Sequence, residues 1–226
     1  MLMRHYPLFL DLADRAVLVV GAGTVGRRKI VSLLQYSPRE VLVVDPGLTP
    51  AAMRELTDSG PVRCRAGAFA PDDLDGKFLA FAATNLRDVN SLLASLCRER
   101  NILCNIADAP GESDFLVPAH FSVNGLTVAL STAGHSPALA RHLRTELEAW
   151  VGMRYAGLLT VLGRLRPLVL ALGLPTEENS ALFRSIIRSS LAVLLEQRRY
   201  TAAAALLTKL LPQPLHAHRE ELLHGL

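Results

Sequence analysis

The sequence contains few cysteines and no long apolar run. Its 226 residues include three cysteines, Cys64, Cys97 and Cys104, which form no CxxC pair and no cluster with histidine. An odd number of scattered cysteines argues against a disulfide framework and a zinc site, and it indicates the reduced thiols of a cytoplasmic protein. No uncharged apolar run reaches about 18 residues, and the patch before Asp11 is too short for a signal peptide, so neither a membrane span nor secretion is expected.

The sequence also has no large excess of positive or negative charge. The 24 basic and 21 acidic residues give a net charge of +3, and no run of five Lys and Arg residues occurs. Charge therefore gives no indication of nucleic-acid binding, whereas a small positive excess suits a small acidic ligand. With 50% hydrophobic and 20% charged residues, the chain can fill one large core or two smaller ones.

The first half alternates short apolar runs with helical segments. The runs Ala16–Val20 and Glu40–Asp45 are typical of strands that are buried on both faces. Three more strands are expected at 62–65, 78–82 and 102–106, and helices are expected at 25–36, 49–59 and 87–100. This alternation predicts an α/β fold with a Rossmann-like, doubly wound parallel sheet, whose ligands bind at the edge where the carboxyl ends of the strands meet.

The second half follows a different pattern after Pro110. Residues 111–121 resemble a loop, and residues 126–131 resemble one more strand. Beyond Pro137 the apolar spacing predicts helices at 137–150, 153–172, 179–197 and 201–211, and Pro167 is expected to kink or break the second of them. We therefore expect a Rossmann domain at residues 1–115, a small region at 116–150 and a helical domain at 151–226.

A glycine-rich loop follows the first expected strand and opens a helix. Gly21, Gly23 and Gly26 form a GxGxxG pattern. In such a pattern the first glycine permits a tight turn, the second lets a pyrophosphate approach the backbone, and the third lets the helix pack closely on the sheet. With Thr24 and Val25, this loop is expected to hold the phosphates of NAD at a helix N-terminus.

The second expected strand ends in Asp45 and Pro46, which are also expected to contact the cofactor. A carboxylate at this position accepts hydrogen bonds from the adenosine ribose and repels a 2′-phosphate, so NAD is favoured over NADP. The alternative is a glycine-rich turn that binds nothing. The order of strand, glycine loop, helix and acidic residue favours the binding site.

Two more loops are expected at the same edge of the sheet. Ala83, Thr84 and Asn85 follow the fourth strand, where small side chains let the ribose and nicotinamide lie against the backbone, although Thr84 or Asn85 could also cap the next helix. Asn105 and Asp108 follow at the nicotinamide end of the site. Asp108 is a candidate general acid or base, and the alternative is an aspartate that caps its own turn.

Several motifs, taken together, resemble one family. In chain order they are HYPLF at 5–9, GAGTVGRRK at 21–29, FAATN at 81–85, CNIADAP at 104–110 and STAGHSPALARHLR at 131–144. Their order and spacing resemble the siroheme synthase N-terminal family, whose members are precorrin-2 dehydrogenases and in some cases also sirohydrochlorin ferrochelatases. The resemblance covers about residues 4–150.

The resemblance implies a function for the chain. It implies NAD-dependent oxidation of precorrin-2 to sirohydrochlorin, with Asp108 at the position of the family's essential aspartate. It also implies a homodimer and a role for residues 116–150 in dimerisation and substrate binding. A regulatory serine of some members corresponds to Thr132, so phosphorylation is not expected there.

The implied substrate is an octacarboxylate tetrapyrrole, which needs cationic and N–H donor groups. In segment 131–144, Ser136 and Pro137 are typical of a helix start that aims N–H groups at an anion. Two arginines three residues apart suit carboxylates, although they could also be solvated and paired with glutamates one turn further on. The expected substrate contacts are Ser131, Thr132, Ser136, Arg141 and Arg144.

Other functions and a metal site remain open at this point. Fe²⁺ would be a partner only for a ferrochelatase, and no compact group of metal ligands occurs, so no metal site is expected. His216, His218 and His224 are interpreted as part of a mobile polar tail. The alternative functions are a non-catalytic NAD-sensing regulatory module, which needs neither Asp108 nor segment 131–144, and a dehydrogenase of another small substrate.

Overall fold

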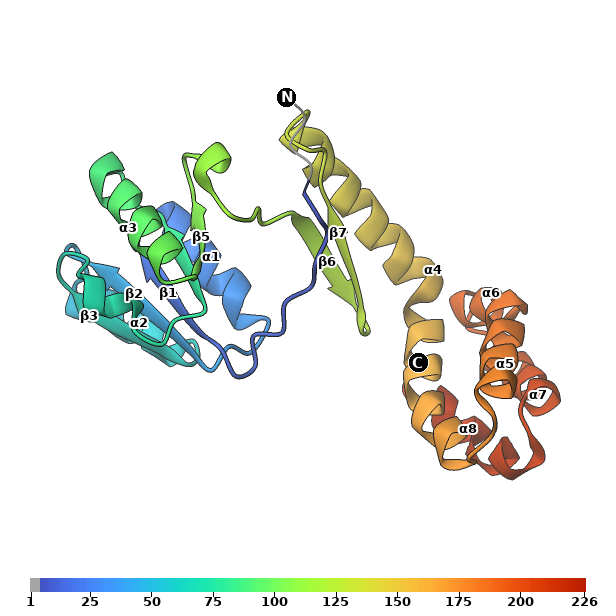
Figure 1. The fold of residues 1–226 in the computed structure, drawn as a ribbon. Coiled ribbons are helices and arrows are strands. Elements are labelled where there is room, and N and C mark those ends of the chain that lie inside the picture. Colours follow the sequence, from blue (N-terminus) through green and yellow to red (C-terminus); the bar gives the residue numbers. More distant parts are fainter. Residues whose placement is uncertain (1–4) are drawn as a thin grey trace. The chain divides into compact units, whose positions relative to one another are not determined.

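The computed structural model describes residues 5–226 (Figure 1). These residues divide into two compact units, residues 5–117 and residues 118–226. We call the first the sheet unit and the second the hairpin–helix unit. Each is described by itself.

The sheet unit is built on five parallel strands. They lie in the order β3-β2-β1-β4-β5, so the chain reverses its direction of winding between β1 and β4. This is the doubly wound arrangement that the sequence predicts, and it confirms the expected fold class. The strands are β1 Ala16–Val20, β2 Glu40–Asp45, β3 Val62–Ala66, β4 Leu79–Ala82 and β5 Leu103–Ile106.

Helices cover both faces of this sheet. The helices are α1 Thr24–Leu34, α2 Pro50–Asp58 and α3 Arg87–Glu99, and the short 3-10 turns are η1 Pro71–Leu74 and η2 Pro110–Glu112. Successive strand residues point to opposite faces. Val17 and Val19 therefore pack with residues of α1 and α2, whereas Leu18 and Val20 pack with residues of α3. Burial on both faces explains the continuous apolar runs of β1 and β2.

A partly exposed ion-pair cluster joins three segments at the edge of the sheet where the parallel strands begin. Glu40, the first residue of β2, accepts hydrogen bonds from Lys77 at 2.8 Å and from Arg63 at 3.1 Å. The hydrogen bond from Lys77, and then that from Arg63, holds the pKa of Glu40 below its usual range. The folded state therefore favours the ionised carboxylate more than the unfolded state does.

We expect Glu40→Gln to lower the free energy of unfolding by about 1 kcal/mol near pH 7. Because the folded-state pKa is lowered, this stabilisation is present above the ordinary pKa of a glutamate and is lost as the pH falls through the folded-state value. Urea unfolding over a pH series measures it. The matched control is Glu55→Gln, which removes the exposed ion pair with Arg27 and should change little at any pH. An equal loss for Glu40→Gln at every pH would contradict the electrostatic explanation.

The hairpin–helix unit begins with two antiparallel strands, β6 Ala119–Val123 and β7 Leu126–Leu130. Asn124 and Gly125 form the turn, and both have positive φ, 46° and 87°, as a type I′ hairpin requires. Asn124 also donates hydrogen bonds to the Ala156 carbonyl at 3.0 Å and to the Thr160 hydroxyl at 2.9 Å, both on the following helix, α4. The hairpin is thereby fixed to that helix.

Helix α4, Pro137–Ala171, is longer than the sequence pattern predicts. It is one continuous helix rather than helices at 137–150 and 153–172, and Pro167 lies inside it without ending it. Its buried residues Val151, Leu158, Val161, Leu165 and Val169 follow helical spacing on both sides of the proline. Their burial offsets the backbone hydrogen bond that a proline inside a helix removes, which costs about 3 kcal/mol.

Three other expectations for this unit were wrong. Residues 119–123 form β6 rather than a loop, because they pair with β7. The helix expected at 179–197 is divided into α5 Thr176–Arg188 and α6 Leu191–Glu196, because the Ser189 hydroxyl accepts a hydrogen bond from the Leu191 N–H and ends the regular pattern. The histidine-rich segment is not a polar tail but part of the fold.

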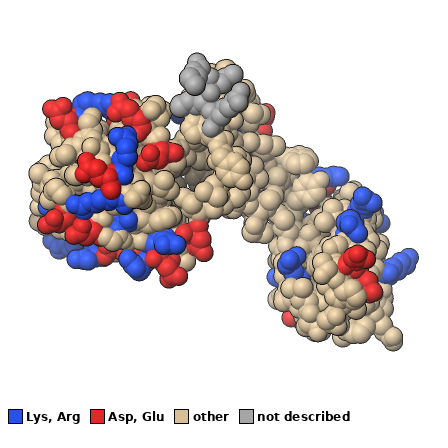
Figure 2. Space-filling model, in the orientation of Figure 1, with Lys and Arg blue, Asp and Glu red and all other residues tan. Residues whose placement is uncertain are grey.

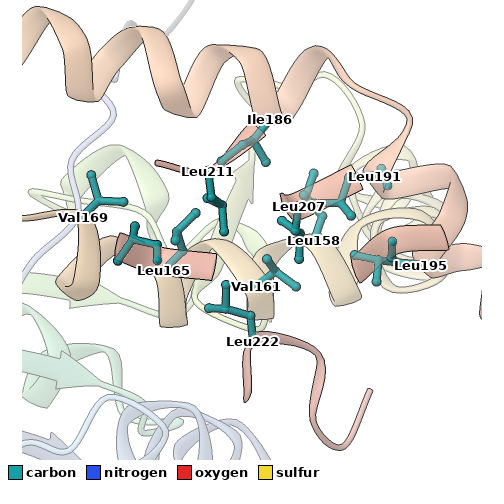
Figure 3. Close-up of a cluster of buried hydrophobic side chains, with 13 residues drawn as sticks. Leu158, Val161, Leu165, Val169, Ile186, Leu191, Leu195, Leu207, Leu211 and Leu222 are labelled. Carbon is teal, nitrogen blue, oxygen red and sulfur yellow. The ribbon is translucent and has the colours of Figure 1, made fainter. Parts of the chain in front are cut away.

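That segment closes the helical core. It consists of η3 Gln213–His218 and α8 Arg219–Leu223, and it follows α7 Tyr200–Leu210. Leu215 and Leu222 are buried, and His216 hydrogen-bonds the Leu211 carbonyl at 2.9 Å. Figure 3 shows Leu222 among the buried side chains of α4. Within residues 5–226, none of the helices combines the length and apolarity that a membrane crossing requires.

Candidate functional site

The loop between β1 and α1 is held by close backbone packing. Gly21 has φ +100°, and a Cβ there would lie 2.5 Å from the Ala83 carbonyl oxygen. A Cβ on Gly26 would lie 1.8 Å from the Gly21 carbonyl oxygen. The Gly21 N–H bonds the Val44 carbonyl at 2.9 Å, and the Ala83 N–H bonds the Val20 carbonyl at 2.8 Å. Only glycine fits at both positions, so the loop has one shape.

Gly23 is the open point of the same loop. It is exposed, and no atom lies within 4 Å of where its Cβ would be. It is the N-cap of α1 and contributes no side-chain hydrogen bond, and the first turn of α1 contains no acidic residue. The free N–H groups and the positive end of the helix dipole are therefore available to an anion. These features fit a dinucleotide pyrophosphate.

Asp45 stands beside the glycine loop at the end of β2. Its Oδ2 accepts the Ala22 N–H at 2.6 Å, and its Oδ1 accepts the Gly47 N–H at 2.6 Å. Each carboxylate oxygen can accept more than one hydrogen bond, so the half-buried group retains acceptor sites for a ribose hydroxyl. Pro46 follows it and is exposed. The carboxylate thus lies where the sequence places it relative to the loop.

The β4–α3 loop has its own internal hydrogen bonds. The Thr84 hydroxyl accepts the Leu86 N–H at 3.1 Å and donates to the Asn90 Oδ1 at 2.7 Å. The N-cap of α3 is Leu86, without a side-chain cap, so neither Thr84 nor Asn85 is the N-cap residue. Thr84 instead joins the start of the loop to the second turn of α3. Ala83 is half-buried and Asn85 is exposed.

Asn105 is buried and has both ends of its amide occupied. Its Nδ2 donates to the Phe115 carbonyl at 2.9 Å, and its Oδ1 accepts from Lys29 Nζ at 3.2 Å. The Lys29 ammonium also lies 5.3 Å from the centre of the Phe81 ring, and burial, then the charge of Arg28, lowers its pKa. In this structure Asn105 therefore fixes the chain after β5. Sequence reasoning missed Lys29, which lies in the GRRK run with no distinguishing feature.

Asp108 lies on the exposed loop after β5. The Ala107 N–H bonds the Ala82 carbonyl at 2.9 Å, which attaches this loop to the end of β4. The Oδ1 of Asp108 accepts a hydrogen bond from Asn90 Nδ2 at 3.3 Å. Because β1, β4 and β5 are parallel neighbours, the glycine loop, the 83–85 loop and Asp108 share one edge of the sheet. The structure brings the expected residues of the sheet unit to that edge.

The expected substrate contacts lie around the start of α4, in the hairpin–helix unit. Ser136 caps the helix by accepting the Leu139 N–H at 3.2 Å, and Thr132 accepts the Ser136 N–H at 3.0 Å. Ser131 accepts the Ala133 N–H at 3.2 Å. Arg144 pairs with Glu148 at 2.7 Å, as in the solvated-surface alternative, and Arg141 is exposed.

Two general features concern ligands and charge. Among residues 5–226, no three His, Cys, Asp or Glu side chains are grouped so that they could hold a metal ion. Figure 2 shows acidic and basic side chains intermixed over the visible face of the sheet unit. This mixed surface agrees with the small net charge of the sequence.

Comparisons with known proteins identify the relatives of this chain. Residues 8–119 match a family described as "Putative NAD(P)-binding". Siroheme synthase from Methylobacillus flagellatus is 40% identical over 156 residues, which are 69% of this chain and 33% of that protein. Siroheme synthase 1 from Aeromonas hydrophila is 34% identical over 212 residues, which are 94% of this chain and 45% of that protein. The resemblance that the sequence motifs indicate is therefore confirmed, because siroheme synthases are similar to this chain over most of its length.

A solved structure supports the same relationship. The structure of SirC, a precorrin-2 dehydrogenase, superposes with a TM-score of 0.72 and 29% sequence identity, and the match covers 86% of this chain and 96% of that one. These comparisons support NAD as the cofactor of the sheet unit. The chain spans less than half the length of the two siroheme synthases above.

Proposed function

We propose that this relative of the siroheme synthases oxidises precorrin-2 to sirohydrochlorin with NAD. The observation that carries the proposal is the position of Asp108, which is at the same sheet edge as the glycine loop and is hydrogen-bonded to Asn90. The similarity to SirC and to the siroheme synthases supports the choice of substrate. A non-catalytic NAD sensor would have no use for a carboxylate at that position.

Different residues of the sheet unit would bind the cofactor and transfer the proton. Bound NAD would supply the hydride acceptor. The backbone N–H groups at Gly23 and the start of α1 would hold its pyrophosphate, and Asp45 would accept the adenosine ribose hydroxyls. Asp108 would take the proton that the substrate loses with the hydride and would pass it to water. The products are then sirohydrochlorin, NADH and a proton, which balances the two-electron oxidation.

We also propose that the hairpin–helix unit provides substrate contacts and the interface of a homodimer. Arg141 and the Ser131–Thr132 segment are exposed or half-buried at the start of α4, where they would face substrate carboxylates. Further along α4, Trp150 is 50% exposed and Met153 is 66% exposed, as suits a surface that pairs with a second chain. Sedimentation equilibrium tests the dimer, and a purely monomeric protein would contradict it.

Direct turnover tests the function. We expect the wild-type protein, mixed with precorrin-2 and NAD, to produce NADH and sirohydrochlorin in equal amounts, as followed by their absorption spectra. NAD binding without NADH formation would favour the sensor, and turnover only with other substrates would favour a different dehydrogenase. Addition of Fe²⁺ or Co²⁺ to sirohydrochlorin in the same cuvette tests for metal insertion.

The preference for NAD provides a second test. We expect Asp45→Ala to weaken NAD binding about tenfold, because a charged hydrogen bond to the ribose is lost, and to narrow the gap between NAD and NADP. Titration of the protein with both cofactors measures the ratio of dissociation constants. The control is Asp58→Ala, which removes the same charge from an exposed position at the end of α2 and should keep the wild-type ratio. An unchanged ratio in Asp45→Ala would argue against the ribose contact.

A further inference from the structure

Asn90 is a polar residue at a core position. It lies in the second turn of α3 and is 0% exposed, in the same buried stripe as Leu93, Ala94 and Cys97. An amide in such a place loses its hydration and must regain hydrogen bonds within the protein. An apolar side chain would be the ordinary choice for this stripe. The partners of Asn90 therefore indicate what the polar group is for.

Those partners are the two loops of the candidate site. Asn90 Nδ2 donates to the Thr84 carbonyl at 3.0 Å and to Asp108 Oδ1 at 3.3 Å, and Asn90 Oδ1 accepts from the Thr84 hydroxyl at 2.7 Å. The carbonyl of Thr84 can only accept, so the NH₂ end of the amide must face it. The same NH₂ group then has its second hydrogen for Asp108. The orientation of the amide follows from its partners.

This geometry leaves Asp108 with one oxygen engaged and one available. The donor from Asn90 occupies Oδ1, and among residues 5–226 no hydrogen bond joins Oδ2. The hydrogen bond from Asn90 orients the carboxylate and leaves Oδ2 as the oxygen that could accept a proton. Close to Asn90 along α3, Arg87 pairs with Glu112 of η2, and Asp88 lies in the first turn of the helix.

We propose that Asn90 is a positioning residue that orients Asp108 for proton transfer and links it to the cofactor loop at Thr84. This inference rests on the proposed function, because it assigns Asp108 to that reaction. Asn90 is 0% exposed, so we assign it a positioning role rather than a contact with cofactor or substrate. It joins the loop after β4 to the loop after β5, so one side chain fixes Asp108 relative to the cofactor loop at Thr84.

The test compares variants that change the hydrogen bond with one that changes only the charge. Asn90→Asp places a second carboxyl beside Asp108, so the pair retains a proton over a wider pH range and the acid limb of the kcat profile should move up by about one pH unit. Asn90→Leu removes the donor at similar volume and should lower kcat about tenfold, with less effect on the KM for precorrin-2. Ser91→Asp adds the same charge on the exposed side of α3 and should keep the wild-type profile.

Each outcome bears on the inference. An acid limb of the kcat profile that moves up in Asn90→Asp and not in Ser91→Asp supports the inference. An unmoved profile, with activity lost only in proportion to the folded protein measured by circular dichroism, would make Asn90 a structural residue and overturn it. A wild-type protein that never oxidises precorrin-2 overturns the proposed function and this inference together. Wild-type turnover with unaffected Asn90 variants overturns the inference alone.

Discussion

Asp108→Asn is expected to lower kcat for precorrin-2 oxidation by about 100-fold or more, because a general base contributes about 10²–10⁴-fold. The amide has the shape of the carboxylate and retains an oxygen that can accept from Asn90, but it cannot take a proton at neutral pH. The dissociation constant for NAD should stay within a few-fold of wild type, because Asp108 lies on a different loop from the glycine turn. Stopped-flow absorbance of NADH measures kcat, and displacement of bound, fluorescent NADH by NAD measures the dissociation constant for NAD.

Asp108→Ala separates the proton-acceptor role from a structural one. It removes the partner of Asn90 as well as the base, so it should be as inactive as Asp108→Asn and somewhat less stable. Glu112→Gln is the control, since it neutralises an exposed carboxylate in the following turn. If either Asp108 variant failed to fold or lost NAD binding, the aspartate would be structural. Nearly full activity in Asp108→Asn would remove the aspartate from the mechanism.

Gly26→Ala is expected to destabilise the sheet unit by about 3 kcal/mol and to abolish detectable NAD binding. The added Cβ would lie 1.8 Å from the Gly21 carbonyl oxygen, and both contacting groups are backbone, so no side chain can move aside. Either α1 must separate from the turn or the turn must lose its shape. Urea unfolding and NADH titration measure both effects. Wild-type stability together with wild-type affinity would contradict this close packing.

Gly23→Ala provides the contrast within the same motif. The Cβ there meets no protein atom within 4 Å, and the φ of −68° suits alanine, so the fold should be almost unaffected. The methyl group would occupy the space that the pyrophosphate needs, and NAD affinity should fall about tenfold. Gly152→Ala makes the same change in open space on α4 and should leave the affinity alone. Equal affinities in all three proteins would show that Gly23 does not face the cofactor.

The parts of the fold that local patterns specify were predictable. The doubly wound parallel sheet and the glycine turn follow from buried apolar runs and from residues whose backbone needs are distinctive, such as Gly21 and Gly26. Strand β6 was missed because its identity depends on pairing with β7 rather than on its own sequence. The continuity of α4 through Pro167 was missed because burial against the later helices, which no local pattern records, decides it.

The candidate site was predictable in part. The glycine loop and Asp45 form a motif, and Asp108 was placed by its position after a strand. Asn90 and Lys29 were not foreseen, because each bonds a side chain that comes from another element, Asp108 and Asn105 respectively. A signal did exist for Asn90, which is the polar member of an apolar helical stripe. A polar residue at such a core position can be recognised from the sequence, although its partner cannot.

The contact between Gly21 and the carbonyl of Ala83 has a consequence for how a ligand enters. Two turns, from strands on either side of the point where the winding reverses, are wedged against each other, so neither can swing outward alone. A dinucleotide would then bind to a preformed site and would not need to order a flexible loop around itself. A preformed site loses little conformational entropy when the ligand binds, so fewer strong contacts are needed for a given affinity.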